Sequence, residues 1–211
     1  MNPTSDSSSP CLVETPWFPP ERPVAALKEW SGVVGALASG RQTILIRAGG
    51  LHERRGPGRF RLEHQAFWLW PTRLHQDQQG LKPEAVAPVI PDPGTLAPPR
   101  LDLVAVVAWR THVESLELLG RLDSLHVWTT DTIHLRFTQR RPGVDLLVLR
   151  VWRCEPVAPP PGTDPSGCSS WVEWPDPLAG PLVRPLGPAL PTDQFQAQLD
   201  QVARLLECPA Q

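Results

Sequence analysis

The sequence predicts an α+β domain with a mixed or barrel-like sheet, two or three flanking helices and an additional C-terminal helix. Three features predict this class: short apolar runs typical of buried strands, separate segments with helical spacing, and 27 prolines that fall mostly outside both. A chain of 211 residues that is 41% hydrophobic suffices for one domain with tails. We expect a disordered tail over residues 1–22, a globular domain over 23–175, a proline-rich linker over 176–191 and an amphipathic helix over 192–208.

The first predicted elements are a helix and a strand. Apolar residues spaced by three, four and three positions predict a helix over residues 24–39, which Gly40 would end. Residues 41–47 alternate as a half-buried strand does. Gly49 and Gly50 follow, and they permit a tight turn with positive φ.

Three apolar runs predict buried strands. The run over residues 60–70 is apolar on both faces at its end, and Pro71 should stop it. The runs over 101–109 and 145–152 are apolar almost throughout, which is typical of central strands. The sequence SSWVEW, residues 169–174, predicts an edge strand.

Helices and a long connection complete the chain. Residues 72–99 are polar and then proline-rich, so we expect a connection there. Leucines on one face predict a helix over 114–125, and Thr130 is a suitable N-cap for a helix to about residue 137. The apolar face of the C-terminal helix could pack on the body or bind a partner, and we favour packing on the body.

Basic residues gather in the middle of the chain. Residues 41–153 carry 16 basic side chains against 11 acidic ones, whereas residues 1–40 carry two against four and residues 154–211 two against seven. A basic body between acidic ends indicates an anionic partner such as RNA or DNA, although an excess of this size is also common on domains without one.

The sequence predicts a cytoplasmic protein with reduced thiols. No apolar run has the length needed to span a bilayer, and the first ten residues lack the basic and apolar regions of a secretory signal. The four cysteines form no C-x-x-C pair and do not suggest a secreted disulfide framework.

The densest basic segment surrounds the glycine pair. Arginine forks can clamp phosphates, and glycine lets a backbone approach a ligand closely. The candidate phosphate-binding residues are Arg47, Gly49, Gly50, Arg54, Arg55, Arg59 and Arg61. Farther along the chain, Trp128 could stack on a base with Arg136 beside it. The plainer interpretation is a hairpin with a solvated basic tip, and a tryptophan in the core.

Four carboxylate and imidazole side chains are candidates for catalysis: Glu53, Glu63, His64 and His75. A carboxylate beside an imidazole can move protons or, with His75, bind a metal ion. Glu63 and His64 are adjacent, however, so in the predicted strand their side chains should face opposite sides. The plainer interpretation is polar residues at the two ends of a strand, and we expect no metal and no cofactor.

Several common catalytic motifs are absent from the sequence. It contains no G-x-x-x-x-G-K-[ST], no H-E-x-x-H, no G-x-S-x-G and no G-x-G-x-x-G. Lys28 and Lys82 are the sole lysines, so the chain has no E-x-K tripeptide of the usual carboxylate–lysine nuclease core. These absences argue against common nucleotide hydrolysis, zincin proteolysis and α/β-hydrolase chemistry.

Several blocks of sequence resemble a known family. ALKEWSGVVGALASGRQTILIRAGGLHE, FRLEHQAFWLWPTRLHQ, HVWTTDTIHLRF, LLVLRVWR and GCSSWVEW occur in the order found in the bacterial domain-of-unknown-function family 1802, frequent in cyanobacteria. The resemblance covers roughly residues 26–174. Family members usually carry Lys where this chain has Ala48, so the resemblance assigns no basic group there. Members joined to a restriction-endonuclease-like domain imply a role in restriction or nucleic-acid metabolism.

A shorter stretch resembles the ASCH domains. A helix followed by SGRQTILIR is similar to the helix and the G-basic-x-T-x-x-x-R strand of these domains, which belong to the PUA-like superfamily. This resemblance implies a PUA-like barrel sheet and the binding of RNA or of a modified base.

Three functional hypotheses follow. The first is a non-catalytic nucleic-acid-binding module, in which the arginines contact phosphates and Trp128 or Trp70 stacks on a base. The second is an enzyme that acts on nucleic acid or a nucleotide through the Glu and His candidates. The third is a protein-interaction module whose C-terminal helix and tryptophan-rich faces bind a partner.

Overall fold

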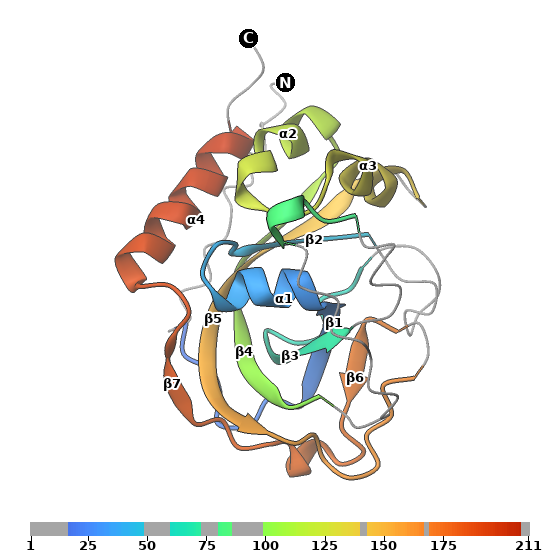
Figure 1. Ribbon diagram of the computed structural model, residues 1–211, viewed down its shortest axis with the longest axis vertical. Coiled ribbons are helices and arrows are strands. Elements are labelled where there is room, and N and C mark those ends of the chain that lie inside the picture. The colour runs from blue at the N-terminus through green and yellow to red at the C-terminus, as the bar shows by residue number, and fades with distance from the viewer. Residues whose placement is uncertain are drawn as a thin grey trace, which may run out of the picture.

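A mixed sheet of seven strands forms the centre of the molecule, and four α-helices surround it (Figure 1). The computed structural model describes residues 17–48, 60–72, 80–85, 99–139, 143–166 and 169–207, and these counts refer to them. The strands are β1 (Ala25–Trp30), β2 (Ile44–Arg47), β3 (Ala66–Thr72), β4 (Leu101–Val113), β5 (Val144–Val157), β6 (Trp171–Glu173) and β7 (Pro185–Pro188). The helices are α1 (Ser31–Ala38), α2 (Leu116–Arg121), α3 (Thr130–Thr138) and α4 (Thr192–Glu207).

The sheet is built around the long strand β5. The strand order is β2-β5-β4-β3-β1-β6, and β7 also pairs with β5. The β1–β3 pair is parallel, and the other pairs are antiparallel. β5 bends through a long arc (Figure 1), so that β2 pairs with its residues 145–148 and β7 with its residues 152–154. The predicted α+β class with a mixed sheet and a C-terminal helix is confirmed.

The predicted helix over residues 24–39 is wrong in its first half. Ala25–Trp30 form β1, and α1 begins only at Ser31. β1 lies between β3 and β6, where Leu27 and Ala26 belong to two different apolar clusters. A strand that is buried on both faces shows no alternation of polarity, so the spacing of its apolar residues imitated a helix.

The second strand starts and ends later than predicted. β3 begins at Ala66, and residues 60–64 approach it as an irregular segment. Pro71, expected to stop the strand, lies inside β3 in register with Glu29 of β1. β4 pairs with β3 only over Ala66–Trp68, so β3 has a neighbour on one side at Pro71, where a missing amide can be accommodated.

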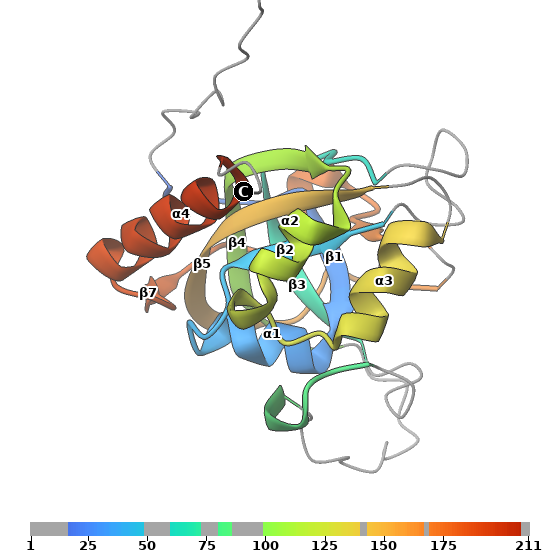
Figure 2. The ribbon, with the colours of Figure 1, turned by 90° about the horizontal axis from the view of Figure 1, so that it is seen from above.

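Side-chain caps fix the starts of the two short helices. The Ser115 hydroxyl accepts a hydrogen bond from the Leu118 amide at the start of α2. The Thr129 hydroxyl accepts one from the Thr132 amide, so α3 is capped one residue earlier than predicted. α2 lies between α3 and α4, which occupy opposite sides of the molecule (Figures 1 and 2).

The C-terminal helix packs on the body. Its residues Phe195, Leu199 and Val202 are buried in the main apolar cluster. Arg150 of β5 donates hydrogen bonds of 2.7 Å to the carbonyl oxygen of Leu190 and 3.0 Å to the Thr192 hydroxyl. The face that could have bound a partner is therefore covered by the chain itself.

The proline-rich residues 176–191, expected to form a linker, contribute β7 to the sheet. β7 lies beside the second half of β5, where prolines are tolerated because β7 has no further strand beyond it among the described residues. No helix of the described chain is long and apolar enough to cross a membrane.

Candidate functional site

The described residues contain two neighbouring polar clusters. We name Glu29, Arg47 and Arg136 the arginine–glutamate cluster, and Glu63, His64 and Glu173 the carboxylate–histidine cluster. The segment 169–173 connects them, because it contributes side chains to both.

Arg47 joins the two ends of the sheet through Glu29. Glu29 of β1 has a side chain that is 1% exposed, and Nη1 of Arg47 lies 2.8 Å from its Oε2 atom. Nη2 of Arg47 donates to the Ser170 hydroxyl at 2.8 Å, just before β6. β2 begins the strand order, whereas β1 and β6 end it, so this cluster draws the sheet toward a barrel. A buried carboxylate requires such a partner, since unpaired burial of a charge costs several kcal/mol.

Arg136 of α3 adds a second guanidinium. Its Nη1 donates to the carbonyl oxygen of Ile46 at 2.6 Å, and its Nη2 lies 3.8 Å from Oε1 of Glu29. The guanidinium carbon lies 4.6 Å from the centroid of the Trp128 ring and 4.9 Å from that of the Trp30 ring. These contacts hold the group between two indoles, which attract cations electrostatically.

The cluster carries an excess of positive charge. Two guanidinium groups face one carboxylate, and the side chains of Arg47 and Arg136 are 12% and 14% exposed. Burial lowers the pKa of Arg136 to about 10, an effect that Glu29 opposes and Arg47 strengthens. Arg136 therefore remains charged at neutral pH, and its positive charge is poorly screened by water.

The predicted nucleic-acid-binding residues fall into four groups. Arg47 and Arg136 lie together, with the Arg47 fork bonded to protein groups. Arg61 is exposed. Trp128 is fully buried, as Trp70 nearly is, so neither ring offers a face for stacking in this conformation. Outside the described residues lie Gly49, Gly50, Arg54, Arg55 and Arg59.

The second cluster brings together two of the four catalytic candidates. One ligand atom from each of Glu63, His64 and Glu173 lies within 4.8 Å of the others. The prediction that Glu63 and His64 face opposite sides is wrong, because both precede β3 and are not bound by strand alternation. The other two candidates, Glu53 and His75, lie outside the described residues.

His64 is half-buried and packs against Trp171, beside this cluster. Its ring meets the Trp171 ring edge-on, with centroids 5.0 Å apart. Its Nε2 atom is shielded from solvent and has no hydrogen-bond partner in the described part of the chain. The indole of Trp171 is itself fixed, since it donates to the carbonyl oxygen of Arg61 at 3.1 Å.

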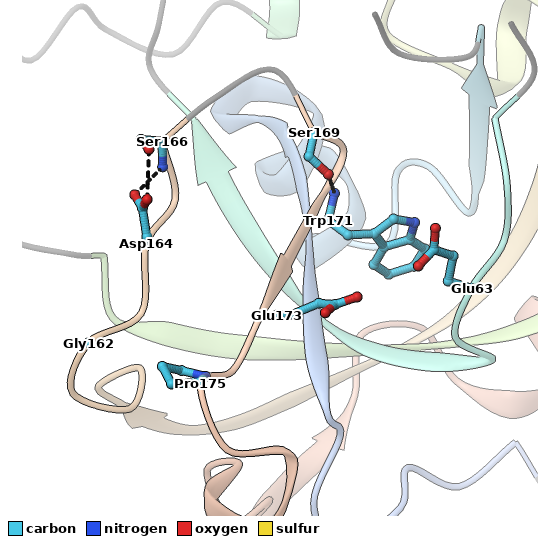
Figure 3. A pocket seen from close by; sticks show the side chains of 8 residues that line it. All are labelled: Glu63, Gly162, Asp164, Ser166, Ser169, Trp171, Glu173 and Pro175. Carbon is cyan, nitrogen blue, oxygen red and sulfur yellow. Dashed lines mark hydrogen bonds between the residues drawn. The ribbon is translucent and has the colours of Figure 1, made fainter. Parts of the chain in front are cut away.

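The cluster borders two cavities that share Glu63. Figure 3 shows the first, of about 480 Å³, in which the carboxylates of Glu63 and Glu173 point toward one another beside Trp171. Asp164 on the far wall accepts two hydrogen bonds from Ser166, which lower its pKa. No basic side chain of the described residues lines this cavity, so it suits a cation better than a phosphate. A second, more apolar cavity of about 600 Å³ is lined by both Glu63 and His64.

Sequence reasoning missed Glu29 and Glu173. Glu29 lies off the apolar face of the helix predicted over residues 24–39, whose first half is in fact β1, so nothing indicated that Glu29 is buried. For Glu173 a signal existed: alternation in the predicted strand SSWVEW places it on the same face as Trp171. No signal linked either residue to its partners, which lie far away in the sequence.

The chain matches the model of a protein family for which no activity is stated. A family model described as "Domain of unknown function (DUF1802)" matches residues 26–201. No curated protein matches the chain.

Among solved structures, the chain is similar to an ASCH protein from Zymomonas mobilis, the domain type that the sequence also resembles. One crystal structure of a point mutant is 14% identical with a TM-score of 0.47, covering 86% of this chain and 98% of that one. A second mutant and the unmodified protein are also 14% identical, with TM-scores of 0.46 and 0.45. These two comparisons each cover 83% of this chain, and 96% and 93% of the other.

Proposed function

Because the chain belongs to domain-of-unknown-function family 1802, whose name states no activity, we propose a function from its own residues: the domain binds nucleic acid through phosphate contacts beside the arginine–glutamate cluster. The observation that carries this proposal is the convergence of Arg47 and Arg136 on the single carboxylate of Glu29. A nucleic-acid partner is consistent with the cytoplasmic location expected from the sequence.

The arginine-rich segment begins and ends at this cluster. Arg47 and Phe60 lie just before and just after the segment that carries Arg54, Arg55 and Arg59 in the sequence. The guanidinium carbon of Arg47 lies 5.2 Å from the centroid of the Phe60 ring, so the two ends of the segment are held together. In the sequence, the further arginines therefore follow directly on a cluster that already carries excess positive charge.

The arginines would have two different roles in binding. Arg61 is exposed and follows Phe60 directly, so it would contact phosphates together with Arg54, Arg55 and Arg59. Arg47 and Arg136 would strengthen the positive potential while their forks hold the protein together. Contacts of this kind supply affinity and orientation, whereas base choice requires further groups. The test must therefore include RNA and DNA, and a DNA carrying modified bases.

Titration of labelled single-stranded RNA, of DNA and of DNA carrying modified bases, by fluorescence anisotropy, tests the proposal. We expect binding at about 50 mM salt that weakens by more than tenfold at about 200 mM, because binding releases condensed counterions. The triple variant Arg54→Gln, Arg55→Gln, Arg61→Gln should lose most of this affinity. Arg204→Gln, an exposed change on α4, should bind as the unmodified protein does. No binding at low salt, or unchanged binding by the triple variant, would refute the proposal.

A second candidate function is acid–base catalysis on a nucleotide or nucleic acid. It is favoured by the proximity of Glu63 and His64 beside an open cavity. Glu63→Gln and His64→Ala should each abolish turnover of RNA or DNA substrates while circular dichroism shows an intact fold. Absence of turnover by the unmodified protein would exclude this candidate.

A further inference from the structure

The geometry points to a binding site for a divalent transition-metal ion, such as Mn²⁺ or Zn²⁺, formed by Glu63, His64 and Glu173. The site shares no residue with the arginine–glutamate cluster and does not depend on the proposed function. It also revises the sequence-based expectation that the chain binds no metal.

The distances between the ligand atoms of the three residues are close to the distances between the ligand atoms around a coordinated ion. The three ligand atoms lie within 4.8 Å of one another. Ligand atoms at about 2.1 Å from a shared ion are about 3.4 Å apart in tetrahedral geometry. Shifts on the order of 1 Å, which side-chain rotation can supply, would therefore bring the three atoms onto one ion. Glu63 is exposed and free to make such a movement.

The donor set selects the class of ion. Two carboxylates supply negative charge, and an imidazole nitrogen favours transition metals over Mg²⁺ or Ca²⁺, which prefer oxygen ligands. The segment 63–64 and strand β6 supply the ligands from distant parts of the sequence. An ion would therefore link β6 to the segment that enters β3.

His64 provides independent support for the site. Its Nε2 atom is buried without a hydrogen-bond partner among the described residues. An unsatisfied buried polar atom costs about 1–3 kcal/mol, so a natural protein usually provides a partner for it. The edge-on contact with Trp171 fixes the imidazole ring, as neighbouring groups commonly orient a metal-binding histidine.

The surroundings favour a cation and leave room for a further ligand. The cavity of about 480 Å³ in Figure 3 is lined by Glu63, Glu173 and Asp164, and by no basic side chain of the described chain. Three protein ligands leave at least one coordination position open, as in sites where a metal ion holds a water molecule or a substrate oxygen. The ion would thus hold a small oxygen-bearing ligand inside this cavity.

Direct metal titration of the full chain, after removal of metals with a chelator, tests this inference. Binding of Mn²⁺ is followed by electron paramagnetic resonance, because Mn²⁺ binds thiols poorly and the cysteines will not compete. Zn²⁺ and Mg²⁺ are titrated by calorimetry for comparison. We expect one Mn²⁺ per chain, and Mg²⁺ binding at least tenfold weaker.

Substitutions locate the ion. Glu63→Gln, His64→Ala and Glu173→Gln should each weaken Mn²⁺ binding by at least about tenfold, since even the loss of an outer-shell partner costs that much. His134→Ala and Glu84→Gln, both at exposed positions, serve as matched controls and should bind normally. Circular dichroism verifies folding, and the exposed position of Glu63 keeps at least that variant informative.

Two results would overturn the inference. One is a folded protein that binds neither Mn²⁺ nor Zn²⁺ at a metal concentration of about 1 mM, which means that the dissociation constant is larger than this value. The other is binding that all three substitutions leave unchanged, which would place the ion elsewhere. Because no nucleic acid is present, neither result bears on the proposed nucleic-acid binding.

Discussion

The guanidinium of Arg47 and the carboxylate of Glu29 form an ion pair of 2.8 Å between β2 and β1, which lie toward opposite ends of the strand order. Three strands separate them along the sheet, so a side-chain contact completes a closure that backbone pairing leaves open. Arg136 approaches the same carboxylate at 3.8 Å, so two arginines lie at the start of the arginine-rich segment. Fold closure and the proposed binding surface thus depend on one pair of residues.

Replacing Arg47 by Gln should destabilise the fold by about 3 kcal/mol, because Glu29 would remain buried with Arg136 as a more distant partner. Urea denaturation followed by tryptophan fluorescence measures this loss. Arg121→Gln breaks an ion pair of similar length, 2.9 Å, on the surface of α2 and should cost less than 1 kcal/mol. Equal effects of the two substitutions would contradict the closure role. Adding Glu29→Gln to the Arg47 variant should restore part of the loss.

Stability should fall as the pH is lowered, because His126 is buried in its neutral form. Burial, strengthened by the charge of Lys82, lowers the pKa of His126 from 6.5 to about 4. Between these values the unfolded chain binds a proton that the folded chain does not, so unfolding becomes easier as the pH falls. The free energy of unfolding should drop by about 2 kcal/mol from pH 7 to pH 4.5 on this account.

His126→Phe should remove that part of the pH dependence, whereas His134→Ala, at an exposed position, should leave it unchanged. Urea denaturation of the three proteins at several pH values makes the comparison. An equally steep pH dependence in the His126 variant would show that other groups cause it.

Helix α4 should prove to be part of the fold. Leu199 is 4% exposed, and Leu199→Ala should cost about 2–5 kcal/mol through lost burial and the cavity left behind. Leu178, which is 85% exposed, offers a control of the same chemistry that should cost under 1 kcal/mol. If deletion of residues 192–211 left a stable monomer, the helix would instead be free to serve a partner.

The sequence predicted those elements whose burial it displays directly. β4 and β5 are nearly continuous apolar runs, and α4 has a single apolar face, so all three were evident. β1 was missed because Ala25, Ala26 and Leu27 are buried on both faces, which removes the alternation that distinguishes a strand from a helix.

The candidate sites were less predictable because they depend on how the sheet curves. Arg47 was identified as a candidate, but its pairing with Glu29 and Ser170 arises only when the two ends of the sheet meet. Glu63 and His64 were also identified, yet the ligand that joins them, Glu173, is contributed by β6 from far along the chain. Sequence periodicity describes single elements and contains no information on such contacts.

The salt dependence of nucleic-acid binding tests the central proposal most directly. The slope of log K against log salt concentration counts the phosphates contacted, at about 0.7 per contact for single strands. We predict that Arg61→Gln lowers the magnitude of this slope by about 0.7, while Arg204→Gln leaves it unchanged. A slope near zero for the unmodified protein, or equal slopes for the Arg61 variant and the unmodified protein, would contradict the proposed phosphate-binding role.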